Sequence, residues 1–191
     1  MQQDGYCGRG VGVRAPQEAG VNDSRARLIA ALGLVVGAAM GIAGTFVPSA
    51  SLRGLAWGLD GTALVLASGL LAVHYLRRGN DLAAAGFLVF VVGQGLILSG
   101  AAMDLVASAP SFAAGAGLWA ASIVLVSASG AMPRWVNVIG YVGALLFAVV
   151  ALQLFLGRAL TPLSRPLPFL AYPFLAATLL GWAWVQYREA A

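Results

Sequence analysis

The chain has 191 residues, of which 60% are hydrophobic and only 9% are charged. Because soluble domains carry about 25% charged residues, this composition excludes an ordinary water-soluble protein and indicates a chain that lies mostly in lipid. The formal net charge is +4, but every basic residue is an arginine, and the arginines stand singly or in pairs at the ends of apolar runs. This placement excludes the clustered basic face of a nucleic-acid-binding protein.

The first part of the chain, residues 1–24, is polar and glycine-rich. It has too few large apolar residues to fold alone, so we expect a flexible cytoplasmic tail. Asp23 or Ser24 is expected to cap the first helix, because their side-chain oxygens can accept hydrogen bonds from free backbone N–H groups. Cys7 is the single cysteine, which excludes an intrachain disulfide and a cysteine-based metal cluster.

Six apolar runs follow, and together they form a predicted transmembrane domain over residues 25–191. Each run has about the 20 residues that a membrane-crossing helix needs. Lipid offers no water to unpaired backbone groups, so each run is expected to be a helix and the fold class is all-α. In the sixth run, Pro173 removes a backbone hydrogen bond and is expected to kink the helix. The predicted spans are 28–47, 55–76, 82–106, 112–131, 135–156 and 168–187.

The arginines also predict the orientation of the spans. If the N-terminus is cytoplasmic, the larger group of arginines lies on the cytoplasmic side, as the positive-inside rule requires. We therefore expect a multi-pass protein of a bacterial inner membrane with both termini in the cytoplasm. The cytoplasmic group is Arg9, Arg14, Arg25, Arg27, Arg77, Arg78, Arg134 and Arg188, and the outer group is Arg53, Arg158 and Arg165.

The first span contains the strongest packing motif in the sequence, "GLVVGAAMGIAG". Gly33, Gly37 and Gly41 recur every four residues and therefore share one helix face. Without side chains there, a second helix can approach closely and make dispersion contacts. The second helix comes either from the same chain or from another copy that self-associates through this face.

Ionisable side chains inside membrane spans are costly, so they are functional candidates. Asp60 and Asp104 both fall in the outer leaflet of the predicted topology. Together they predict a ligand-binding or proton-handling site, with Arg158 and Arg165 as weaker candidates nearby. The alternative is that the two acids form interfacial ion pairs or contacts at helix ends.

His74 and Gln94 are weaker candidates. His74 lies fourteen residues after Asp60, which separates them by about 21 Å along a helix, so they cannot share a proton or a metal. His74 either bonds a backbone carbonyl or lipid headgroup, or contacts a quinone or metal. Gln94 lies in mid-span and serves either as an interhelical hydrogen-bonding group or as a binding residue. No catalytic motif or metal-ligand cluster is found in the sequence.

The second half of the chain carries "MPRWVNVIGYVGALLF" and "PLPFLAYPFLAATLLGWAWV". This pattern has Pro-Arg-Trp at the start of one helix and Tyr-Pro in the last helix. It resembles a broad group of bacterial multi-pass membrane proteins whose function is not assigned. The resemblance implies six helices in a bacterial inner membrane, and it supplies no catalytic residues.

Abundant packing glycines and few buried polar groups favour a non-enzymatic protein. We expect an accessory or scaffold subunit that packs within a larger membrane complex, with lipids and protein subunits as partners. The alternative is a protein that binds or transforms a lipophilic small molecule at a site built on Asp60 and Asp104. A small transporter that acts as an oligomer is the third hypothesis. No cofactor is predicted, although a quinone or another lipophilic molecule fits the alternative.

Overall fold

The computed structural model describes residues 16–101 and 104–190, and within them it confirms the predicted all-α bundle. Six helices and no strand occur in these two ranges. The helices are α1 (Pro16–Phe46), α2 (Ala50–Arg77), α3 (Asp81–Ala101), α4 (Ala109–Ala128), α5 (Arg134–Phe155) and α6 (Tyr172–Ala190).

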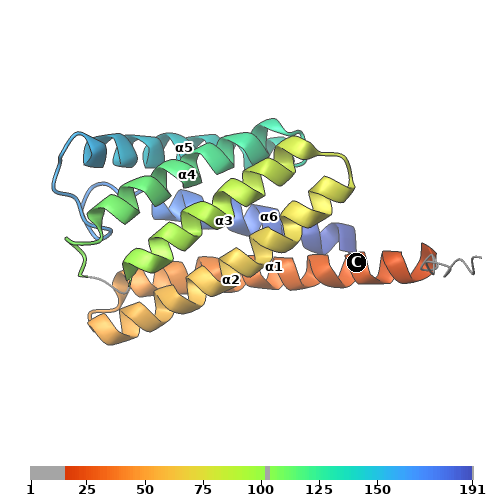
Figure 1. Ribbon diagram of the computed structural model, residues 1–191, viewed down its shortest axis with the longest axis horizontal. Helices are drawn as coiled ribbons and strands as arrows, with labels where there is room; N and C mark the ends of the chain where they lie inside the picture. The colour runs from red at the N-terminus through yellow and green to blue at the C-terminus, as the bar shows by residue number, and fades with distance from the viewer. Residues whose placement is uncertain (1–15, 102–103, 191) are drawn as a thin grey trace, which may run out of the picture.

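The helices form a closed ring in which each packs against the next one in sequence. The ring closes because α6 packs against α1 as well as α5. Successive helices run antiparallel, and a longer segment, residues 156–171, connects α5 to α6, so α1 begins and α6 ends at the same end of the bundle (Figure 1). In Figure 1, α3 crosses in front of α6, with α1 and α2 on one side and α4 and α5 on the other.

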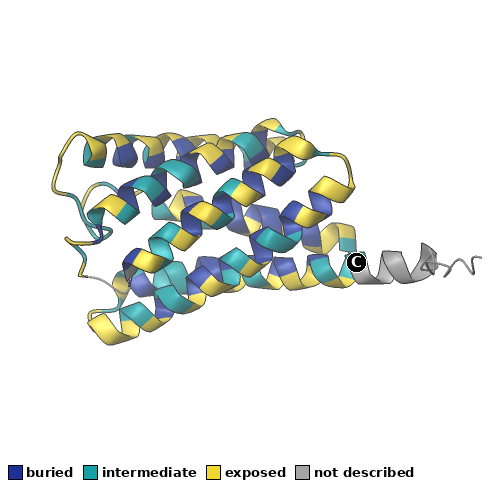
Figure 2. Cartoon of the chain, in the orientation of Figure 1, coloured by how far each residue is buried: buried dark blue, intermediate teal, exposed yellow. Residues whose placement is uncertain are grey.

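Five of the helices are long and apolar enough to cross a membrane, which supports a membrane protein. Their outward-facing side chains are exposed and mostly large and apolar, whereas the buried residues face the interior of the ring (Figure 2). These five segments are Asp23–Phe46, Ala50–Arg77, Asp81–Gly100, Ala109–Ala128 and Arg134–Phe155.

Helix α6 is not among these five segments. The predicted span 168–187 starts too early, because the four residues before Tyr172 form turns, and the helix continues to Ala190 through polar residues such as Arg188. Pro173 is the second residue of α6, in the first helical turn, where its missing N–H needs no partner. The predicted kink at Pro173 is therefore wrong.

Two other predicted boundaries differ from the structure. Residues 1–15 of the predicted tail lie outside the described residues, but residues 16–24 belong to α1, so Asp23 is inside a helix and does not cap it. The third predicted span, 82–106, is too long because α3 ends at Ala101 and a turn precedes α4.

The glycine stripe of α1 faces α2 of the same chain. A Cβ atom at Gly33 would lie 2.9 Å from the backbone oxygen of Ala63, and one at Gly41 would lie 3.3 Å from the Asp60 carboxyl group. A side chain at Gly37 would collide with Leu64. The two helices are therefore close enough that this face is covered within the chain.

Aromatic side chains fill the centre of the ring. The Tyr75 and Phe87 rings stack with centroids 5.6 Å apart, and Trp182 of α6 meets Phe87 edge-on at 5.0 Å. Trp182 also meets Phe90 at 5.9 Å, which stacks on Trp119 at 6.2 Å. These large buried rings hold α2, α3, α4 and α6 together, because aromatic pairs in these geometries attract beyond their buried area.

Candidate functional site

A cavity of about 70 Å³ lies inside the ring, toward the end of the bundle where α1 ends and α2 begins. We call it the Asp60 cavity. Its walls come from α1, α2, α3, α4 and α6, together with Leu105 and Ser108 before α4 and Pro162 between α5 and α6. Most of its lining is apolar, and the side chains that carry its chemistry are Thr45, Trp57, Asp60, Gln94, Ser108, Phe112, Trp119 and Tyr172.

Asp60 supplies the acid of this cavity. It is buried on α2, with 9% of its surface exposed, and it faces the gap that Gly41 leaves on α1. The Gln94 side chain on α3 faces its carboxyl group, but among the described residues no side chain forms a hydrogen bond or an ion pair with it within standard distances. A buried acid whose polar neighbour lies beyond standard hydrogen-bond distance is costly, and this cost points to a group that binds there.

Gln94 lies in the same cavity on α3 and is completely buried. Neither its amide nitrogen nor its amide oxygen has a hydrogen-bond partner in the described part of the chain. The indole nitrogen of Trp119, which also lines the cavity, is likewise without one. Buried polar groups are normally paired, so these atoms are available to a molecule that enters the cavity.

The hydroxyl groups of Tyr172 and Ser108 in the cavity already donate hydrogen bonds to backbone carbonyl groups. Tyr172 Oη donates to the Pro162 carbonyl at 2.9 Å, and Ser108 Oγ donates to the Leu105 carbonyl at 2.9 Å. Their lone pairs are still available as acceptors. Together with the Asp60 carboxyl group and the Gln94 carbonyl, they make the cavity richer in acceptors than in donors.

The structure does not bring the other predicted site residues into this cavity. Asp104 is exposed in the turn before α4, where its carboxyl oxygen accepts hydrogen bonds from the backbone N–H groups of Val106 at 2.6 Å and Ala107 at 3.0 Å. Arg158 is exposed in the segment after α5. The Arg165 guanidinium lies 4.4 Å from the centroid of the Phe169 ring. The predicted pairing of Asp60 with Asp104 is therefore replaced by Asp60 with Gln94.

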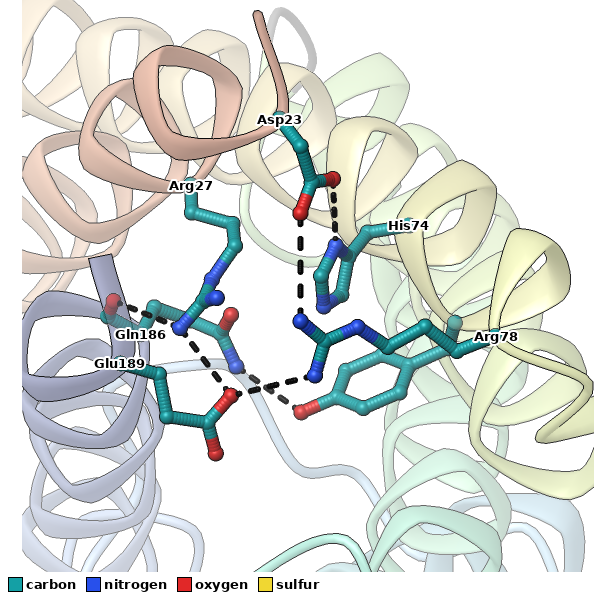
Figure 3. A network of polar contacts seen from close by, with 7 residues as sticks. Asp23, Arg27, His74, Arg78, Gln186 and Glu189 are labelled. Atoms are coloured by element: carbon teal, nitrogen blue, oxygen red, sulfur yellow. Dashed lines mark hydrogen bonds and ion pairs between the residues drawn. The ribbon is translucent and has the colours of Figure 1, made fainter. Parts of the chain in front are cut away.

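His74 belongs to a second group of polar residues at the opposite end of the bundle, which we call the polar cluster (Figure 3). His74 Nδ1 lies 2.8 Å from Asp23 Oδ1 of α1, so its partner is a carboxylate, which was not among the predicted partners. The Arg78 guanidinium lies between two acids, 4.0 Å from Asp23 and 3.6 Å from Glu189. The cluster consists of Asp23, Arg27, His74, Tyr75, Arg78, Gln186 and Glu189.

The polar cluster ties the two ends of the helical ring together. Arg27 of α1 is buried and lies 3.0 Å from Glu189 of α6, and it donates to the Gln186 carbonyl at 3.3 Å. The Gln186 amide in turn donates to the Tyr75 hydroxyl at 2.9 Å. Two acids face two arginines in this cluster, and its contacts join α1, α2 and α6.

Comparison with protein-family models, curated proteins and solved structures finds no match. The function is therefore inferred from the residues of the Asp60 cavity. Of the predicted ligand-site candidates, Asp60 and Gln94 line it, and so do Gly37 and Gly41 of the predicted packing face.

Replacing Gln94 with leucine is expected to stabilise the protein, by about 1 kcal/mol, because it removes two buried polar atoms that lack partners. Gln186 is the matched control, since it is equally buried but its amide nitrogen donates to the Tyr75 hydroxyl, which leaves one unpaired amide atom in place of two. Gln186→Leu is expected to lower the free energy of unfolding by about 1–2 kcal/mol. Denaturant titrations in detergent micelles compare the two variants, and an equal loss in both contradicts the assignment of Gln94 as unpaired.

Proposed function

We propose that the protein binds a small amphiphilic ammonium compound in the Asp60 cavity. The observation that carries this proposal is the buried Asp60 carboxyl group, which faces a cavity and forms no hydrogen bond or ion pair within standard distances among the described residues. An ammonium group has three donors and a positive charge. It would supply the hydrogen bonds and the countercharge that Asp60 lacks.

The other walls of the cavity favour the same ligand class. The Gln94 carbonyl and the Ser108 hydroxyl supply further acceptors. The aromatic rings of Trp57, Phe112 and Trp119 also line the cavity. The face of an aromatic ring attracts a cation, by about 0.5–2 kcal/mol. A carboxylate beside several rings is therefore a better site for an organic cation than for an anion.

The size of the cavity limits the ligand. A volume of about 70 Å³ holds a compact head group but not a large fused-ring compound. Apolar side chains, including Ile97, Leu98 and Leu105, surround this space and suit a short alkyl portion. We therefore infer a primary amine that carries an alkyl group as the preferred ligand.

The topology that goes with this function has six spans, with α6 crossing the membrane beside the five apolar helices. Two observations support this arrangement: α6 packs between α1 and α5, and its polar residues Gln186 and Glu189 are paired within the polar cluster. The arginine distribution and the resemblance of the second half favour a bacterial inner membrane with cytoplasmic termini. The Asp60 cavity then lies in the outer half of the membrane.

The test measures binding of n-butylamine, which is protonated at neutral pH, with 1-butanol as the uncharged probe of equal length. The amine is expected to bind the wild-type protein in detergent micelles more tightly than the alcohol. Asp60→Asn keeps the shape of the side chain but removes the charge, and it is expected to weaken amine binding about 10- to 100-fold, as loss of a charged hydrogen bond does.

Asp104→Asn is the matched control, because Asp104 is exposed and does not line the cavity. This variant is expected to bind butylamine like the wild type. Equal affinities of the wild type and Asp60→Asn for the amine contradict the proposed function. So does equal binding of amine and alcohol by the wild type.

The accessory-subunit and transporter roles stay predictions. The glycine stripe that motivated the first is covered by α2, so we do not propose self-association through it.

A further inference from the structure

A second hollow lies on the outside of the bundle, along the contact between α1 and α6. This groove has a volume of about 470 Å³ and an apolar lining. Its sides are the exposed chains of Leu28, Leu32 and Val35 on α1 and of Leu180, Trp184 and Tyr187 on α6. Small alanines from both helices lie between these chains and are buried, which gives the groove its depth.

Both helices place an arginine at the same end of the groove. Arg25 precedes Leu28 by three residues and Leu32 by seven, so it continues the groove-lining face of α1. Arg188 follows Trp184 by four residues and therefore continues the face of α6. The Arg188 guanidinium lies 4.9 Å from the centroid of the Trp184 ring, which fixes the charge beside the groove.

These two arginines differ from the arginines of the polar cluster. Arg27 and Arg78 each contact a carboxylate. Arg25 and Arg188 are exposed, and neither forms an ion pair with any carboxylate whose side chain the structure describes. Two positive charges therefore remain at the end of an apolar groove, at the level where α1 and α6 leave the apolar part of the bundle.

We propose that this groove is a binding site for an anionic phospholipid. The phosphate of the lipid lies between Arg25 and Arg188, and one acyl chain lies along Leu32 and Leu180. Basic pockets between membrane helices favour anionic head groups, and each arginine near the surface contributes about 1 kcal/mol to this attraction. A zwitterionic lipid fills the apolar groove equally well but gains less from the two arginines, because its own cation offsets its phosphate.

The experiment titrates the purified full chain, in detergent, with phosphatidylglycerol and with phosphatidylcholine of identical acyl chains, and follows bound lipid by native mass spectrometry. Wild-type protein is expected to prefer the anionic lipid by about 30-fold, which is the sum of two arginine contributions expressed as an affinity ratio. The double variant Arg25→Gln/Arg188→Gln is expected to lose this preference and still bind both lipids.

The matched control is Arg77→Gln/Arg134→Gln, which removes two exposed arginines away from the groove. It is expected to keep the wild-type preference. Ala183→Phe fills the groove and is expected to reduce binding of both lipids, and soluble glycerol phosphate is expected not to compete. The proposal is overturned if the wild type does not discriminate, if the control variant loses the preference as the groove variant does, or if glycerol phosphate competes as well as the lipid.

Discussion

Replacing Gly33 with alanine is expected to lower the free energy of unfolding by about 1–3 kcal/mol, the usual cost of overpacking a close contact. The added methyl group would lie 2.9 Å from the Ala63 backbone oxygen and 3.0 Å from the Ala67 Cβ atom. Backbone and alanine atoms cannot rotate out of the way, so α1 must move away from α2. The same movement would open the wall of the Asp60 cavity, which these helices form together.

Gly69 on α2 is the matched control, because a Cβ atom added there meets no atom within 4 Å. Alanine favours a helix over glycine, by roughly 0.5–1 kcal/mol, so Gly69→Ala is expected to leave stability unchanged or to raise it slightly. Thermal and denaturant unfolding in detergent micelles give the comparison. If both variants lose the same stability, the close approach of α1 and α2 does not explain the effect.

The Arg27–Glu189 ion pair is expected to respond unequally to removal of its two partners. Arg27 is almost completely buried, with 4% of its side chain exposed, whereas 44% of the Glu189 side chain is exposed. Glu189→Ala leaves a buried guanidinium without its carboxylate and is expected to destabilise the protein by about 3 kcal/mol. Arg27→Met removes the buried charge itself and leaves Glu189 near Arg78, so its expected cost is below about 1 kcal/mol.

The double variant Arg27→Met/Glu189→Ala separates this explanation from a general loss of packing. It is expected to be nearly as stable as Arg27→Met alone, because the second change then leaves no buried charge behind. Equilibrium unfolding of the three variants measures the coupling free energy. A larger loss in Arg27→Met than in Glu189→Ala would mean that packing of the arginine side chain, and not burial of its charge, dominates the energetics.

The helices were predictable from the sequence because segments that face lipid are long, uninterrupted runs of apolar residues. Long uninterrupted apolar runs must be helical in a membrane, and the first, second and fifth runs end near the ends of the helices. The end of α3 was missed because the acid of Asp104 caps a turn locally, which the apolar run around it hides. Helix α6 was misplaced because it continues past its apolar part to polar residues, where Glu189 pairs with the buried Arg27 of α1.

The candidate site was predicted only in part. Asp60 and Gln94 stood out as polar residues inside apolar runs, but their proximity depends on how α2 and α3 pack, which no local pattern reveals. The pairing of His74 with Asp23 was missed because Asp23 was assigned to the cap of a helix that in fact begins at Pro16. One signal was present: Asp23 and Arg27 are four residues apart and therefore share a face of α1.

Closure of the ring by α1 and α6 also sets an order of assembly. Ribosomes deliver α6 after the other five helices, so Arg27 and Tyr75 have no α6 partner during most of synthesis. Until then, the first five helices form an open arc that presents a guanidinium and a phenol to its surroundings. Arrival of α6 is the step that closes the ring and gives both groups their partners.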